Sequence, residues 1–187
     1  MKTLYILLVS IFIITSTQAQ ETYQLLKSES SILIKGTSSV HDWESTAEEF
    51  DGAASFVIEE GTLTSLEALS FSVVTESIKS GKRIMDNKTK DALEAKKHPA
   101  IIYSFLSVED LTEDSVTVSG TLNLAGVAKE ISLTGVYQLG ENNTITISGK
   151  ETIDMEEYGI KPPTAMMGTL KTGKEVDVEF NITFSKN

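Results

Sequence analysis

Apolar and polar residues alternate along much of the chain, most regularly between residues 116 and 139. In the first half of this stretch, Val116, Val118, Leu122 and Leu124 lie on one side of an extended segment, with hydroxyl and amide residues on the other. A short loop that contains Gly126 can then reverse the chain, and the alternation resumes up to residue 139. The stretch predicts a β-hairpin with one apolar and one polar face.

Further alternating segments predict strands on both sides of this hairpin. They lie at residues 23–27, 32–36, 50–58, 66–74, 101–108, 144–153 and 176–184. Both phases of residues 101–108 are apolar, which predicts a strand buried on two sides. Eight or nine strands with short connections predict one all-β domain, either a sandwich or a barrel, because alternation alone does not distinguish the two.

The alternation stops between residues 81 and 97, where Lys, Asp, Glu and Ala predominate. Here the apolar residues recur seven or eight positions apart, as at Ile84 and Ala92, which favours a helix. We predict one or two short helices, with Asp86 or Asn87 as the N-cap and Pro99 beyond the end.

The first 19 residues predict a secretory signal peptide. Lys2 precedes a mainly apolar run at residues 4–14, and small residues around Ala19 suit signal peptidase. This run is too short to cross a bilayer, which takes about 20 residues, although an uncleaved anchor is the alternative. We expect cleavage after Ala19, export to the periplasm or the medium, and a mature domain of residues 20–187 without a membrane span.

The composition excludes several classes of function. Because the chain has no cysteine, it has no disulfides, no thiolate metal ligands and no thiol-linked lipid anchor. Its formal net charge is −11, or −12 once Lys2 leaves with the signal, which opposes binding to nucleic acid and to anionic lipid surfaces. The two histidines, His41 and His98, are too far apart in sequence to predict a zinc site.

No motif predicts catalysis. The sequence lacks a G-x-S-x-G elbow. Residues 168–175, GTLKTGKE, resemble a P-loop, but Glu175 stands where a Ser or Thr would hold magnesium, and a predicted strand follows. We therefore expect a non-enzymatic protein that needs no cofactor or metal.

Four ordered segments resemble those of the YceI-like family, also called polyisoprenoid-binding or lipid-binding YceI-like proteins. GTLNLAGVAKEISL at residues 120–133 resembles the family hairpin G-x-L-T-I-x-G-V-T-K-x-V-x-L. KHPAIIYSF at 97–105 is similar to its K-Y-P-x-I-x-F element, and MEEYGI at 155–160 to its D-F-G-I segment. SSVHDW at 38–43 resembles an early His segment, so the resemblance spans nearly the whole mature chain.

This resemblance implies an exported, lipocalin-like antiparallel barrel whose lumen, in some members, holds a long isoprenoid chain such as a quinone tail. One segment departs from the family. RIMDNKTKDALE at residues 83–94 stands where the family has R-D-x-H-L-x-S-x-D-F-F-D, and it lacks the His and the paired Phe. If this segment closes the mouth of the barrel, the ligand can differ from that of other members.

An isoprenoid chain has almost no hydrogen-bonding groups, so its site needs apolar area and shape rather than polar groups. The same alternation is expected of a barrel that its own side chains fill. The candidate lumen residues lie on the apolar faces of the predicted strands and are Phe71, Val73, Leu122, Leu124, Ile131, Leu133 and Tyr137.

Candidate rim residues come from two predicted loops. His41 and Trp43 are two positions apart, so they share a face and can contact a polar head group by stacking and one hydrogen bond. Alternatively, Trp43 plugs one barrel end and His41 ties down a loop. Met166 and Met167 are adaptable apolar side chains that follow two stiffening prolines, which suits a lid, a rim or a plain packed loop.

These observations predict a protein that binds an isoprenoid or other amphiphilic lipid, such as a polyprenol or quinone, and carries or sequesters it in the cell envelope. The alternative is a filled barrel that docks an envelope partner through its end loops. A hollow interior would favour the first function, and a filled interior with an exposed apolar patch the second.

Overall fold

The computed structural model describes residues 21–165 and 169–186, and the predicted signal peptide lies outside this part of the chain. One α-helix, α1 (Arg83–Ala92), interrupts a β-rich chain. The strands are β1 (Glu21–Leu25), β2 (Ser31–Ser38), β3 (Trp43–Ala47), β4 (Phe50–Glu59), β5 (Thr62–Val74), β6 (Ile78–Lys79), β7 (Ala100–Leu111), β8 (Ser115–Leu124), β9 (Val127–Leu139), β10 (Thr144–Asp154), β11 (Thr164–Ala165) and β12 (Leu170–Lys186).

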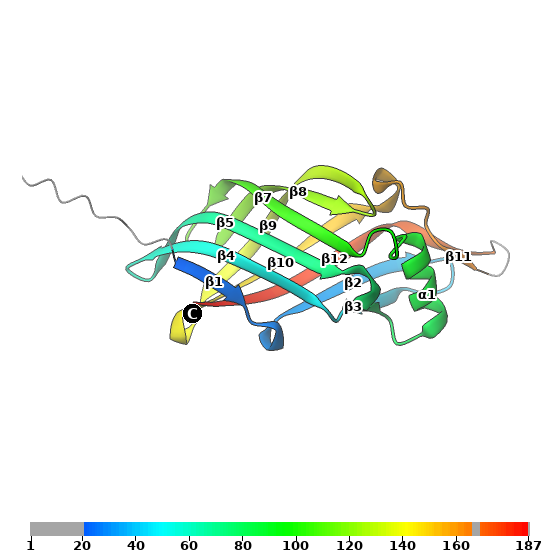
Figure 1. Ribbon diagram of the computed structural model, residues 1–187, viewed down its shortest axis with the longest axis horizontal. Coiled ribbons are helices and arrows are strands. Elements are labelled where there is room, and N and C mark those ends of the chain that lie inside the picture. The colour runs from blue at the N-terminus through cyan, green and yellow to red at the C-terminus, as the bar shows by residue number, and fades with distance from the viewer. Residues whose placement is uncertain (1–20, 166–168, 187) are drawn as a thin grey trace, which may run out of the picture.

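These strands form one closed antiparallel barrel (Figure 1). β2 and then β1 pair with successive parts of one edge of β12, so together they fill one position in the barrel. β3 and β4 pair with β2 and β1 in the same way, and β6 and β5 follow them. With β7, β8, β9, β10 and β12, this makes eight positions and leaves no long unpaired edge. The predicted all-β, lipocalin-like single barrel of about eight strands is confirmed.

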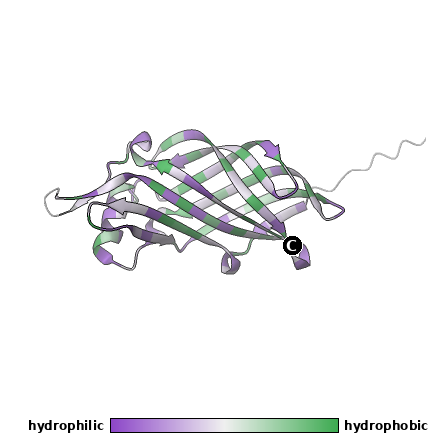
Figure 2. Cartoon of the chain, turned by 180° about the vertical axis from the view of Figure 1, so that it is seen from behind, coloured by the Kyte–Doolittle hydropathy of each residue, from purple (hydrophilic) through white to green (hydrophobic). Residues whose placement is uncertain are grey.

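The hairpin predicted at residues 116–139 is formed by β8 and β9. Ala125 and Gly126 connect the two strands, and both have positive φ, at 50° and 81°. A two-residue turn with two positive φ angles matches the twist of antiparallel strands, and glycine reaches this conformation without strain. Apolar and polar residues alternate along the strands, as the bands of colour in Figure 2 show.

Strand β7 differs from the prediction. It is not buried on two sides, because Ile102 and Leu106 are exposed on the outer wall. The register with β8 shifts between Phe105 and Ser107 and again between Val108 and Asp110. Each irregularity adds a residue and moves the inward-facing positions by one place, so Val108 packs against the core although it shares the phase of Ile102 and Leu106.

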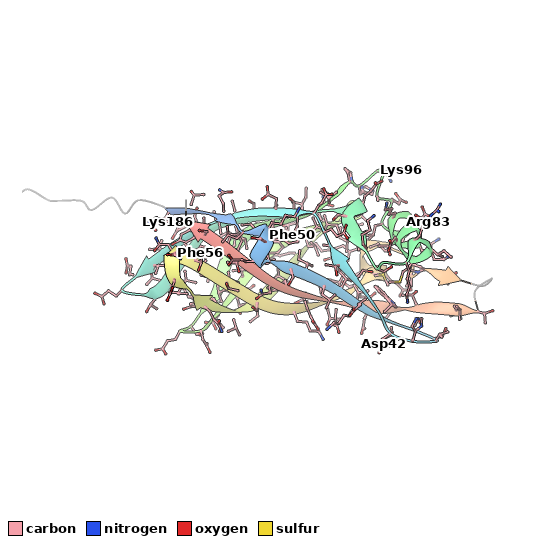
Figure 3. All side chains as sticks on the ribbon, turned by 90° about the horizontal axis from the view of Figure 1, so that it is seen from below. Asp42, Phe50, Phe56, Arg83, Lys96 and Lys186 are labelled. Atoms are coloured by element: carbon pink, nitrogen blue, oxygen red, sulfur yellow. The ribbon has the colours of Figure 1, made fainter. Side chains whose placement is uncertain are left out.

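The two ends of the barrel are built differently. At the end where β4 turns into β5, aromatic rings fill the interior. Phe56 packs edge to face against Tyr23, at 5.1 Å between ring centroids, and against Phe184, at 5.7 Å. The opposite end carries α1 (Figure 1). Figure 3 shows the same separation, with Phe56 and Lys186 near one end and Arg83 and Asp42 near the other.

Helix α1 begins three residues before the predicted cap. Arg83 is its first residue, and Lys82 at the N-cap position makes no side-chain capping bond. Asp86 instead turns back to the preceding segment, where its Oδ1 accepts hydrogen bonds from the backbone N–H of Ser80 at 2.7 Å and from its hydroxyl at 2.6 Å. These bonds hold the helix against the chain that enters it. No helix within residues 21–165 or 169–186 is long and apolar enough to span a membrane.

Candidate functional site: an apolar cavity in the barrel

A cavity of about 940 Å³ occupies the half of the barrel next to α1. This volume lies near the upper end of the range for sites that hold small molecules, about 300–1,000 Å³. Inward-facing side chains from β2, β3, β5 to β10 and β12 form its walls, and α1 contributes Ile84, Met85 and Ala92 to its opening. The barrel is therefore hollow here, and the filled-barrel alternative does not describe its interior.

Most of the predicted lumen residues lie on the wall of this cavity. Strand alternation turns them inward. The cavity wall includes Phe71, Val73, Leu122, Leu124, Ile131 and Leu133. Their role in ligand binding stays a prediction.

Tyr137 does not line the cavity. It is buried in the packed end of the barrel, where its hydroxyl donates a hydrogen bond to the carbonyl oxygen of Thr112 at 3.0 Å. Tyr137 faces inward like Leu133, but it lies four residues farther along β9 toward the filled end. Alternation gives the face on which a residue lies, but not its depth along the barrel axis.

Trp43 and His41 lie at the mouth and both line the cavity. The indole of Trp43 packs against the backbone of Gly36, where even a Cβ atom would come within 2.2 Å of the ring. Its Nε1–H donates to the carbonyl oxygen of Thr37 at 3.1 Å, which fixes the ring at the edge of the opening. Trp43 thus borders the cavity without filling it.

The backbone of His41 is held by Ser38. The Ser38 hydroxyl donates to the carbonyl oxygen of His41 at 2.7 Å and accepts from its N–H at 3.2 Å. The imidazole has no hydrogen-bond partner among the described residues and is exposed at the mouth. It is therefore available to a ligand that occupies the opening.

The other two candidate rim residues, Met166 and Met167, lie outside the described residues. Pro163, Thr164 and Leu170, which flank that segment, line the cavity. The predicted role of the two methionines as a lid or rim stays a prediction.

The sequence reasoning missed two groups of cavity residues. The first lies on β2 and β12, whose inward residues include Ile34, Val178 and Phe180. Their alternation predicts strands, but nothing in it indicates which inward residues lie at the hollow end. The second is the set of basic residues at the opening, namely Lys82, Arg83, Lys88 and Lys171. These residues come from separate segments, and only the fold brings them together.

The model of the YceI-like domain matches residues 23–184 of the sequence. The chain belongs to the YceI-like family. The family resemblance predicted from the four sequence segments is therefore confirmed.

Three solved structures show the same fold. A polyisoprenoid-binding domain from Saccharophagus degradans, implicated in plant cell wall breakdown, has a TM-score of 0.71 at 16% identity, covering 90% of this chain and 100% of its own. Burkholderia cenocepacia BcnA also has a TM-score of 0.71, at 13% identity over 85% of this chain and 98% of its own. A YceI protein of Campylobacter jejuni has a TM-score of 0.61, at 17% identity over 76% of this chain and 84% of its own. No curated protein has significant sequence similarity to the chain.

The chemistry of this YceI-like cavity suits binding better than catalysis. Its wall is almost entirely apolar, and Glu151 is the one carboxylate on it. In the described part of the chain, no group of three or more His, Asp or Glu side chains is placed to hold a metal ion. Tyr103 also lines the cavity, and burial raises the pKa of its phenol to about 12, so the phenol stays protonated at neutral pH. The site thus offers apolar area with few polar groups.

Glu151 lies on the inward face of β10 between Gly149 and Ile153. Burial raises the pKa of its carboxyl group, and a backbone hydrogen bond from Thr152 partly opposes this effect. No Lys, Arg or His side chain within the described residues forms an ion pair with it. A lipid that fills the cavity would remove more water from this carboxylate, which disfavours the ionised form further.

Glu151 should therefore make lipid binding depend on pH. Because the carboxyl pKa is higher in the lipid-bound state than in the empty state, binding takes up a proton. Affinity is then highest below the pKa of the empty state and falls as pH rises toward the pKa of the bound state. The total fall in affinity is about tenfold for each pKa unit by which the two states differ. We therefore expect the Kd of a fluorescent lipid to rise as pH increases between about pH 4 and pH 8.

The substitution Glu151→Gln should remove this pH dependence and leave binding at neutral pH at least as strong as in the wild type. His41→Gln, which removes the imidazole from the rim, is the matched control and should retain the dependence. An unchanged pH profile in Glu151→Gln would show that Glu151 is not the group linked to binding.

Proposed function

We propose that the protein binds an isoprenoid-type or other amphiphilic lipid, such as a polyprenol or quinone, in the barrel cavity and carries or sequesters it in the cell envelope. The observation that supports this most strongly is the apolar cavity of about 940 Å³ that opens at one end of a YceI-like barrel. The domain from Saccharophagus degradans that shares this fold is a polyisoprenoid-binding domain.

The energetics of the cavity favour a long apolar chain. Burial of apolar surface stabilises a complex by about 25 cal/mol per Å², so about 400 Å² of buried chain contributes about 10 kcal/mol before the cost of ordering the ligand. A polar or charged ligand would lose its hydration in the same cavity and find few partners there. An amphiphile resolves this conflict, because its apolar chain fills the lumen while its head group stays at the mouth beside His41 and Trp43.

The envelope location rests on the predicted signal peptide. A lipid carrier outside the cytoplasm must shield its cargo from water, and a closed barrel with one opening does so. The mature protein would begin at Gln20.

Native mass spectrometry of the purified protein, followed by organic extraction, tests this function. We expect a mass that corresponds to residues 20–187 and about one bound lipid per chain, with extraction yielding a polyprenol, a quinone or a related amphiphile. Protein stripped of lipid by organic solvent and refolded should take up a quinone or polyprenol analogue. A chain that carries no lipid and takes up neither analogue would overturn the proposal.

A further inference from the structure

Basic residues are concentrated in one short segment of an otherwise acidic protein. Residues 79–97 contain seven of the sixteen Lys and Arg residues but only three of the 27 acidic residues, which gives this segment a formal charge of +4. The rest of the chain has a formal charge of −15. The net charge of the protein therefore does not describe the surface around this segment.

The fold places the segment at the opening of the cavity. Lys82, Arg83 and Lys88 from α1 and its N-terminal side line the opening together with Lys171 from β12. No carboxylate of the described residues lies within ion-pair distance of Lys82, Arg83 or Lys171. Asp86 on the same helix accepts hydrogen bonds from Ser80, and the cations that interact with its charge are Lys79 and Lys90.

Two exposed apolar side chains accompany these cations at the mouth. Ile84 on α1 is 77% exposed and also lines the cavity, and Val40 in the loop between β2 and β3 is 63% exposed. They are the two most exposed large apolar residues in the described part of the chain. In Figure 3 the labelled neighbours of these residues, Arg83 and Asp42, lie toward the same end of the molecule.

The loop that carries Val40 is held in place. The Ser38 hydroxyl accepts a hydrogen bond from the N–H of Val40 at 3.3 Å. Two hydrogen bonds join Ser39 to Lys171. The N–H of Ser39 donates to the carbonyl oxygen of Lys171 at 2.9 Å, and the Ser39 hydroxyl accepts from the N–H of Lys171 at 3.1 Å. Val40 is thus presented to the outside by an ordered tip, next to a basic residue.

We propose that the open end of the barrel docks on the surface of an anionic lipid bilayer. Ile84 and Val40 enter the head-group region, and Lys82, Arg83 and Lys171 face the lipid phosphates. Apolar burial and attraction between cations and anionic lipids both favour binding at such an interface. The inference rests on the proposed function, because an opening that faces the bilayer lets an apolar cargo pass between membrane and lumen without crossing water.

The charge of the surrounding barrel orients this contact. The acidic wall is repelled by an anionic membrane, whereas the basic mouth is attracted, so the protein should approach with its opening toward the lipid. The expectation that the net charge opposes binding to anionic lipid surfaces then applies to the barrel wall and not to the mouth.

Vesicle flotation tests this docking. We expect the purified protein to float with vesicles of equal parts phosphatidylglycerol and phosphatidylcholine at low salt. With phosphatidylcholine alone, or at about 0.5 M salt, binding should fall at least about fivefold, because salt screens exposed charges. Ile84→Asp, Val40→Asp and the pair Lys82→Glu with Arg83→Glu should each lower binding to the anionic vesicles by a similar factor.

Leu106→Asp and Val136→Asp are matched controls. These residues are 55% and 51% exposed on the outer wall, and each substitution makes the same change in charge as at Ile84 or Val40. Both controls should bind vesicles like the wild type, and a thermal melt should show that all variants are folded. Equal loss of binding in wall and mouth variants would overturn the docking surface.

The lipid uptake assay separates this inference from the proposed function. Protein that takes up a quinone analogue from detergent solution but does not float with anionic vesicles would overturn the docking and leave the carrier function standing. Protein that floats through its mouth residues but takes up no lipid would support the docking and refute the carrier function.

Discussion

Replacement of Phe56 by Ala should destabilise the protein by about 3–5 kcal/mol, the range measured when a large aromatic side chain is removed from a packed core. Phe56 is 1% exposed and contacts the rings of Tyr23 and Phe184 edge to face. Removal of its ring leaves a void beside these two rings, which lie on β1 and β12. The total stability of a domain is about 5–15 kcal/mol, so this loss would be a large part of it. Urea denaturation followed by circular dichroism measures the change.

Phe71→Ala is the matched control, because it removes the same ring from the hollow part of the barrel. Phe71 stacks against Phe50 at 6.0 Å, but it also faces the cavity. We expect a smaller loss of stability than for Phe56→Ala, together with weaker lipid binding, because the lost contacts include contacts with the ligand. If the two substitutions destabilise the protein equally, the interior around Phe71 is as tightly packed as the end of the barrel, and the division into a filled and a hollow half is wrong.

This division marks the limit of what the sequence predicts. The alternation of Leu122 and Leu133 with polar neighbours correctly placed both side chains on the inner face. Tyr137 has the same alternation, yet it belongs to the filled end. Its depth depends on how far β9 is staggered against its neighbours, and this stagger arises from long-range pairing that a local pattern does not contain.

Strand β7 and helix α1 show two other limits. The two register shifts in β7 change which residues face inward, and the local sequence pattern did not reveal where they occur. The basic mouth was missed because it joins α1 to Lys171, which is about 80 residues farther along the chain. The net charge of the whole chain is negative and gives no sign of this local group of basic residues. By contrast, the ordered family segments predicted the fold correctly, because together they fix the order of strands and turns.

Introducing Trp at both Leu122 and Leu133 should abolish high-affinity lipid binding and leave the fold intact. Both side chains face the cavity from neighbouring strands, so the indoles would occupy space that the lipid needs. If they displace about 100 Å² of lipid contact, the loss at about 25 cal/mol per Å² is about 2.5 kcal/mol, or about 70-fold in Kd. The measurement is a titration of stripped protein with a fluorescent polyprenol or quinone analogue.

The cost to the fold should be small because the new rings enter empty space, whereas overpacking of a filled core costs about 1–3 kcal/mol. Trp at both Asn123 and Ser132 is the matched control, since these residues are next in sequence to Leu122 and Leu133 and are exposed on the outer wall. It should bind lipid like the wild type. Full lipid affinity in the inward-facing double variant, with a normal melt, would mean that the lipid lies elsewhere, whereas a loss in both double variants would point to a general disturbance of the hairpin.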